Sequence, residues 1–211
     1  MCQYTESRFR LSRIQVKIPL MATTMRADAL RNHERIVAAA REAFRESGAD
    51  VQMEEIARRA GVGVGTLYRH FATKDVLVGE LTRVKLSEFA ERVRRKFEDE
   101  SDPWDAFAGA LREQVLVMAG DAAYQRMPYA STPEAMALAE PAIRELYAAW
   151  DATIEHAKAA GVVRADLQID DIRTLMCGLG AMMAADARGV FKYNWDRQLQ
   201  LFLDGVRAGP G

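Results

Sequence analysis

The chain has 211 residues, enough for one globular domain or for a small domain joined to a larger one. Hydrophobic residues make up 49% and charged residues 28%, which is ordinary for a protein that buries a core. No apolar run approaches the roughly 20 residues of a membrane helix. The two cysteines, Cys2 and Cys177, do not form a CxxC pair. We therefore expect no membrane span, no disulfide framework and no cysteine zinc site, and a protein of the reducing cytoplasm.

The net charge of −1 is unevenly distributed along the chain. Residues 1–97 contain 19 Lys and Arg against 12 Asp and Glu, a net charge of +7. Residues 98–211 contain 10 against 18, a net charge of −8. A basic N-terminal part joined to an acidic C-terminal part suggests an anionic partner at one end only. Basic helix faces that are merely solvated are common, so the asymmetry is weak evidence without a motif.

Residues 1–25 differ from the rest of the chain. Ile14, Val16 and Ile18 alternate with polar residues as in an edge strand, but no neighbouring segment offers a partner strand. The stretch also lacks the continuous apolar core of a secretory signal. We expect a disordered extension, or a start codon assigned too early, and the alternative is a basic arm that follows DNA.

The segment after this extension has the periodicity of a helical domain. Residues 29–47 carry apolar side chains every four positions (Ile36, Ala40 and Phe44), which predicts an amphipathic helix, and Gly48 is well placed to end it. A short helix is expected at MEEIARRA, residues 53–60.

Thr73 is expected to cap a long helix over residues 74–97. At 1.5 Å per residue this helix measures roughly 36 Å, long enough to join two domains.

Residues 98–211 contain several helix-start signals and no strand signal. Helix starts are expected at Asp102–Pro103, Thr132–Pro133, Asp170–Asp171 and Asn194. Pro141 should kink or split the helix that begins at Thr132, and Gly161 should end it. The sequence therefore predicts an all-α fold of about nine helices, with a small three-helix domain over residues 26–75 joined by the long helix to a C-terminal helical bundle over residues 76–211.

Residues 61–71, GVGVGTLYRHF, pose the main functional question. A phosphate-binding loop needs GxxxxGK[ST] or GxGxxG between a strand and a helix. Here the spacing is GxGxG, a helix precedes it, and no lysine follows the last glycine directly. Both spacing and context therefore exclude a phosphate cradle.

A helix-turn-helix fits the same residues. It needs two helices joined by a three- to four-residue turn, often with glycine. Ala57 supplies a small residue at the helix crossing, Gly61 a residue that tolerates positive φ, and Leu67 an apolar anchor in the second helix. Winding the second helix at 100° per residue, with Leu67 and Phe71 inward, makes Val64 lean inward as well.

The opposite edge of this second helix carries the candidate DNA contacts. Gly65 and Arg69 point outward, with Thr66 beside them, which suits a helix in the major groove because Arg can donate twice to guanine. Tyr68 and His70 fall on the two flanks, where phosphates lie. Lys74 begins the next helix, whose free N–H groups can bind a phosphate. Singly, each such side chain is more often simply solvated. Their joint placement supports the DNA-binding interpretation.

These motifs carry a family resemblance. The segments HERIVAAAREAFRESGA and MEEIARRAGVGVGTLYRHFATKDVL, within residues 32–78, resemble the DNA-binding domain of the tetracycline-repressor (TetR) family. The resemblance implies that Val64, Gly65, Thr66 and Arg69 face bases, and that Tyr68, His70 and Lys74 hold phosphates. Gln52 departs from the pattern, because the family commonly has a capping threonine there and Gln is a poor cap.

The family resemblance also implies a dimer, and the sequence agrees. The run LMCGLGAMMAA is apolar on all sides, so its helix needs cover on two faces, one of which a partner subunit can supply. The candidate interface residues are Leu175, Gly178, Leu179, Met182, Leu199, Phe202 and Leu203. A two-fold dimer would bind a palindromic operator.

An effector pocket is the other expectation for the C-terminal half. Large adaptable side chains there could line a cavity, although at helical spacing they more often form a core. The candidates are Trp104, Phe107, Met118, Tyr124, Met127, Trp150, Met176 and Met183. Asp151 and His156 are poorly aligned for acid–base chemistry, and no nucleophile or metal-ligand cluster accompanies them.

The sequence thus predicts a dimeric transcription regulator, a repressor that binds double-stranded DNA and an unknown small-molecule effector. We expect no enzymatic activity, cofactor or metal. The alternative is a helical ligand-binding or enzymatic domain with a vestigial helix-turn-helix.

Overall fold

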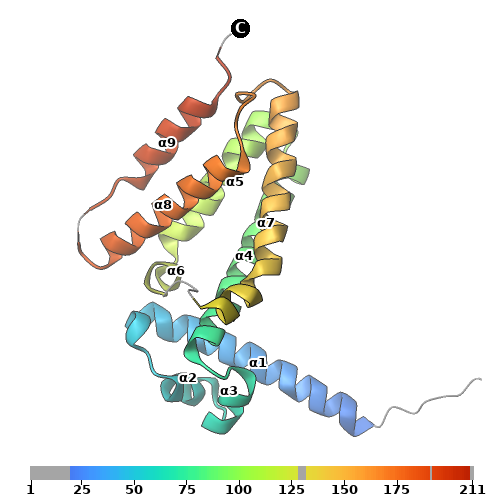
Figure 1. The fold of residues 1–211 in the computed structure, drawn as a ribbon, viewed down its shortest axis with the longest axis vertical. Helices are drawn as coiled ribbons and strands as arrows, with labels where there is room; N and C mark the ends of the chain where they lie inside the picture. The colour runs from blue at the N-terminus through green and yellow to red at the C-terminus, as the bar shows by residue number, and fades with distance from the viewer. Residues whose placement is uncertain (1–19, 128–131, 191, 210–211) are drawn as a thin grey trace, which may run out of the picture.

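The computed structural model describes residues 20–127, 132–190 and 192–209, without the side chains of residues 20–26, Tyr124 and Arg126. Over these residues the chain is all-α, as the sequence predicted (Figure 1). The helices are α1 (Leu20–Ser47), α2 (Met53–Ala60), α3 (Val64–His70), α4 (Lys74–Asp99), α5 (Pro103–Gly120), α6 (Ala122–Arg126), α7 (Pro133–Ala159), α8 (Ile169–Ala187) and α9 (Trp195–Val206), with a 3₁₀ turn, η1 (Gly48–Asp50), after α1. In the described ranges, none of these helices combines the length and apolar character needed to cross a membrane.

The helix boundaries follow local signals that were visible in the sequence. Gly48 and Gly161 take positive φ angles of 60° and 67° just beyond α1 and α7, as expected of helix-ending glycines. Four predicted N-caps are confirmed, because each side chain accepts a hydrogen bond from the backbone N–H three residues on: Thr73 from Val76 (3.2 Å), Asp102 from Asp105 (2.9 Å), Thr132 from Ala135 (3.3 Å) and Asn194 from Arg197 (3.0 Å).

Three boundaries differ from the prediction. α1 begins at Leu20, so residues 20–25 of the predicted extension are helical, in keeping with their Met and Ala content; residues 1–19 lie outside the described residues. α7 is not split at Pro141, which is exposed, so water can satisfy the carbonyl that lacks its N–H partner. α8 begins at Ile169 rather than after Asp171, whose carboxylate accepts from the backbone N–H of Gln168 at 2.8 Å.

Two hydrophobic clusters divide the chain, and both include residues of α4. The first gathers α1, α2 and α3 around Ile36, Phe44, Ile56 and Leu67, and reaches Leu81 on α4. The second is built from α4, α5, α7, α8 and α9, and begins on α4 at Phe89. Figure 1 shows α4 rising from the small lower unit into the larger upper bundle. α4 is therefore the element through which one cluster can influence the other.

α4 and α7 run parallel and side by side. At their start a Cβ on Gly79 would lie 2.6 Å from the carbonyl oxygen of Ala135. Midway Ser87 donates to Glu145 at 3.4 Å, and at the far end the rings of Phe97 and His156 meet edge to face at 5.2 Å. The second turn of α4 and the first turn of α7 thus approach each other backbone to backbone, next to the helix-turn-helix unit formed by α1, α2 and α3.

Candidate nucleic-acid interface

The turn between α2 and α3 has helix-turn-helix geometry. α2 ends at Gly61, which takes φ +64°, a left-handed conformation that favours glycine. The backbone N–H of Val62 then donates to Ala57 at 3.0 Å. Gly63 begins α3 as its N-cap, with its carbonyl accepting from Thr66 at 2.8 Å. The turn has three residues, within the three to four predicted from the sequence.

The inner face of α3 is packed as predicted. Leu67 is 0% exposed and Phe71 is buried, and both belong to the cluster formed with Ile56 and Ala57 of α2. The cap of α2 is weak, as the sequence indicated, because the side chain of Gln52 makes no cap hydrogen bond. Its amide donates instead to the carbonyl of Asp50 at 2.8 Å.

The outer face of α3 is open to solvent. Gly65 and Arg69 are exposed and Thr66 is half-buried beside them. A Cβ on Gly65 would come no closer than 4.0 Å to a neighbouring atom, the Nη2 of Arg69, so nothing within the chain requires glycine there. Val64 is 41% exposed, which corrects the helical-wheel prediction that it leans inward. As the first residue of α3, it lies where no other element covers the helix.

Tyr68 and His70 occupy the two flanks of α3. Tyr68 is 42% exposed, and its hydroxyl donates to Glu54 on α2 at 3.4 Å. Loss of hydration and the Glu54 carboxylate raise its pKa. The hydroxyl has one proton, so it would have to turn from Glu54 to donate to a phosphate. His70 is half-buried, with its ring centroid 6.1 Å from that of His33 on α1.

Lys74 has intramolecular partners that the sequence did not indicate. Its ammonium donates to the carbonyl oxygens of Ala49 and Val51, the latter at 2.7 Å, and lies 5.8 Å from the ring centroid of Phe44. The amine therefore fixes the connection between η1 and α2. Whether it also holds a phosphate stays a prediction.

The predicted effector residues are mostly packed in the second cluster. Phe107, Met118, Trp150, Met176 and Met183 are buried there and Trp104 packs against it. The indole N–H of Trp150 donates to Gln114 at 3.2 Å. Met183 also borders a surface hollow near Trp195. The side chain of Tyr124 lies outside the described residues. A pocket lined by this set stays a prediction.

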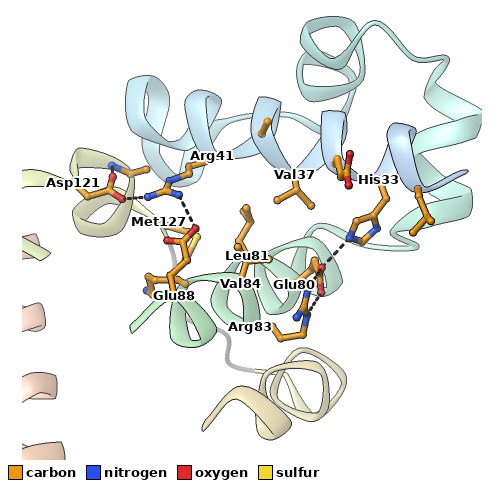
Figure 2. A pocket seen from close by; sticks show the side chains of 15 residues that line it. His33, Val37, Arg41, Glu80, Leu81, Arg83, Val84, Glu88, Asp121 and Met127 are labelled. Carbon is orange, nitrogen blue, oxygen red and sulfur yellow. Dashed lines mark hydrogen bonds and ion pairs between the residues drawn. The ribbon is translucent and has the colours of Figure 1, made fainter. Parts of the chain in front are cut away.

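A cavity of about 570 Å³ does open elsewhere, between α1, α4 and α6 (Figure 2). Of the predicted effector residues with described side chains, Met127 alone lines it. The sequence analysis missed its polar lining, which consists of His33, Glu34, Arg41, Glu80, Arg83, Lys85, Glu88 and Asp121. The available signal was the spacing of His33, Val37 and Arg41, which places them on one face of α1.

The predicted dimer residues divide into two groups. Leu179, Leu199 and Leu203 are buried in the chain's own second cluster. Leu175, Met182 and Phe202 are half-buried, and Gly178 is exposed, with nothing within 4 Å of the point where a Cβ would lie. Among the described residues, no group of three or more His, Cys, Asp or Glu side chains is placed to hold a metal ion.

An all-α chain whose helix-turn-helix exposes a glycine–threonine–arginine edge is a DNA-binding transcription regulator. Residues 36–81 match the tetR family of bacterial regulatory proteins, and residues 102–208 match the C-terminal domain of SbtR-like transcriptional regulators. The chain therefore belongs to the TetR family. This family consists of regulators rather than enzymes, so the alternative of an enzymatic domain is not favoured.

Individual relatives agree with this assignment. A helix-turn-helix-type transcriptional regulator of Staphylococcus aureus (strain bovine RF122 / ET3-1) is 33% identical over 88 residues, 41% of this chain and 48% of the relative. The match thus spans about half the length of that curated relative. The crystal structure of a TetR regulatory protein from Mycobacterium vanbaalenii is 29% identical, with a TM-score of 0.57 over 87% of this chain and 99% of that one. FadR from Bacillus subtilis, solved in complex with stearoyl-CoA, shares the fold at 21% identity, with a TM-score of 0.64 over 82% of this chain and 96% of that one.

Proposed function

We propose that the chain is a cytoplasmic repressor that binds a palindromic DNA operator as a homodimer and is controlled by a small-molecule effector. The observation that carries the proposal is the exposed edge of α3. Arg69 has a clear path to donate to guanine O6 and N7, and Gly65 lets the helix backbone approach base edges. Thr66 and Val64 complete the base-facing surface, and the Val64 side chain can contact a thymine methyl group.

The flanking residues would fix the position of α3 on the DNA. Tyr68 and His70 lie on opposite sides of that edge, and each can donate to a phosphate on one wall of the groove. Lys74 would add a phosphate contact at the N-terminus of α4, where the helix dipole also favours an anion. Such contacts neutralise phosphates and release counterions, so binding should weaken steeply as salt rises.

The outer faces of α8 and α9 are the proposed dimer interface. Gly178 and the half-buried side chains Leu175, Met182 and Phe202 lie along these two helices, next to Leu201, which is 47% exposed. A two-fold axis through this surface would bring together α8 and α9 of both subunits as four helices. The buried Leu179, Leu199 and Leu203 would support that surface from beneath.

The effector is proposed from the family and from the arrangement of α4. Stearoyl-CoA bound to the Bacillus subtilis FadR is an example of a ligand held by this fold. In this chain α4 belongs to both hydrophobic clusters, so a ligand that rearranges the second cluster would move the first. The predicted set that includes Trp104, Met127 and Trp150 remains the proposed lining.

The test is selection of bound fragments from the organism's own DNA, followed by titration of a recovered fragment with variants. We expect a palindromic site, and a loss of sequence discrimination of about 10- to 100-fold in Arg69→Ala. Gly65→Ala should fold normally and bind the site more weakly. Arg188→Ala, at the exposed C-terminal end of α8, is the matched control and should bind as the wild type does. Binding that is insensitive to salt, or an Arg69→Ala variant that still discriminates sequence, would contradict the proposal.

A further inference from the structure

The cavity between α1 and α4 lies where the helix-turn-helix unit joins the rest of the chain (Figure 2). Val37 and Ala38 of α1 form one wall, Leu81 and Val84 of α4 form the other, and Met127 closes the end beside α6. The volume of about 570 Å³ falls within the roughly 300–1,000 Å³ of known small-molecule sites. The middle of this cavity is apolar and can hold the body of a ligand.

Charged groups line both ends of the apolar middle, and most of them pair with one another. At one end Arg41 donates to Asp121 at 2.6 Å and to Glu88 at 3.4 Å. At the other end Glu80 accepts from Arg83 and bonds to His33. Three of the four lining carboxylates, those of Glu80, Glu88 and Asp121, therefore already accept hydrogen bonds from arginine, and the fourth, Glu34, is exposed at the rim of the cavity.

Lys85 also lines the cavity, on α4. Burial lowers the pKa of its amine to about 8, although the nearby Asp121 favours the charged form and Arg41 opposes it. An ammonium group carries three N–H donors, so it can accept a further anionic partner beside those it has. A negative group brought into the cavity would offset the cost of burying this charge.

We propose that this cavity binds a small amphipathic carboxylic acid, with its apolar body between Val37, Leu81 and Val84 and its carboxylate beside Lys85. This site is separate from the predicted effector set, most of which packs in the second cluster, although Met127 belongs to that set and lines this cavity. An occupant would sit between α1, which belongs to the first cluster, and α4, which connects the two clusters. Its binding would therefore reset the angle of the helix-turn-helix unit on α4; this consequence rests on the proposed DNA-binding function.

The binding test uses the full chain without DNA, titrated by calorimetry with decanoate, decanol and decylamine. Decanoate should bind saturably, decanol should bind at least about tenfold more weakly, and decylamine should not bind, because only decanoate pairs with an ammonium. Lys85→Met should reduce decanoate affinity to that of decanol. Lys192→Met, which removes an exposed lysine that does not line the cavity, should leave both affinities unchanged.

Two further variants test whether the ligand binds in this cavity. Val37→Trp and Ala38→Trp each fill it, and Ala38 is exposed, so the second variant should fold even if the first does not. Decanoate and decanol should both fail to bind a filled variant whose circular dichroism spectrum matches that of the wild type. Decanoate that never saturates, that binds Lys85→Met as tightly as wild type, or that still binds a folded, filled variant would overturn the proposal.

The regulatory consequence has its own readout. Decanoate should change operator affinity by about fivefold or more in the wild type and have no effect in Lys85→Met. An unchanged operator affinity in wild type saturated with decanoate would overturn the coupling. Because ligand binding is measured without DNA, a failure to bind any operator would be a separate result that bears on the proposed function.

Discussion

The Nε2 atom of His33 on α1 lies 2.9 Å from Oε1 of Glu80 on α4, and this pair ties the helix-turn-helix unit to the connecting helix. Glu80 is only 6% exposed, and Arg83 donates to its two oxygens at 2.7 and 2.8 Å. Burial alone would raise the pKa of Glu80, but the hydrogen bonds from Arg83 and His33 outweigh it and lower the pKa. The carboxylate is therefore expected to be charged and structurally important.

Glu80→Gln should destabilise the fold by about 1–3 kcal/mol at neutral pH, because it weakens charge-assisted hydrogen bonds to a buried group. The folded-state pKa lies below the unfolded value, so the stabilisation is present above the unfolded pKa and is lost as pH falls through the folded pKa. Urea unfolding near neutral pH and again below about pH 4 should show the difference between wild type and variant shrinking in acid. Glu34→Gln, an exposed carboxylate on α1, is the control and should change stability little.

Gly79→Ala should destabilise the chain although alanine is the better helix former. The new Cβ would lie 2.6 Å from the carbonyl oxygen and 2.7 Å from the Cα of Ala135. These are backbone atoms, so they cannot rotate away from the new Cβ as a flexible side chain could. The start of α7 must move away, at a cost of about 1–3 kcal/mol. Gly120→Ala, whose Cβ meets nothing within 4 Å, should gain up to about 1 kcal/mol. Thermal melts compare the two, and a Gly79→Ala protein as stable as wild type would disprove the close approach.

Features set by neighbouring residues in sequence could be predicted. The turn at Gly61 and the caps at Thr73 and Asn194 depend on residues within about five positions of one another, and the anchor at Leu67 packs against the helix just before it in the chain. The family resemblance added the roles of the exposed residues on α3. Val64 was assigned to the wrong side because a helical wheel takes no account of where the covering helices end.

Features set by residues far apart in sequence could not be predicted. His33 and Glu80 are 47 residues apart, and Lys74 reaches back 23 residues to Val51. The buried Met and aromatic residues of the second cluster have the same spacing whether they fill a core or line a pocket. The cavity beside Lys85 depends on how closely α1 approaches α4, which no local pattern determines.

Lys74→Met tests whether this lysine has one role or two. The loss of hydrogen bonds to the carbonyls of Ala49 and Val51 should lower stability by about 1–3 kcal/mol. If the amine also contacts a phosphate, the slope of log affinity against log salt should become shallower by about one. Lys192→Met serves as the control for both measurements. A lower melting temperature with an unchanged salt slope would assign Lys74 a structural role only.

Gly178→Leu should break the proposed dimer without unfolding the subunit. Within one chain nothing lies within 4 Å of the added Cβ, so the side chain can extend into solvent. Across a dimer axis the same side chain would hold two helices apart. Light scattering during gel filtration should show a monomer for Gly178→Leu and a dimer for Gly120→Leu, whose position on α5 is equally open. A dimeric Gly178→Leu protein would place the interface elsewhere.

Lys85 should make the stability of the chain rise with pH in the alkaline range. Burial lowers the pKa of its amine from 10.5 to about 8 in the folded chain. Between these two values the unfolded chain binds more protons at this site, so folding becomes more favourable as pH increases. Below the folded pKa the poorly hydrated charge of this half-buried side chain destabilises the chain by roughly 1–3 kcal/mol, and this cost disappears as pH approaches the unfolded value.

Urea unfolding of wild type and Lys85→Met at about pH 7, 9 and 10 isolates this site, because the other titrating groups are common to both proteins. The variant should be the more stable protein at neutral pH, with its advantage falling steadily toward pH 10. Stability curves that stay parallel over this range would mean that the amine is well hydrated in the folded chain, and would remove the electrostatic reason for an anion in the cavity between α1 and α4.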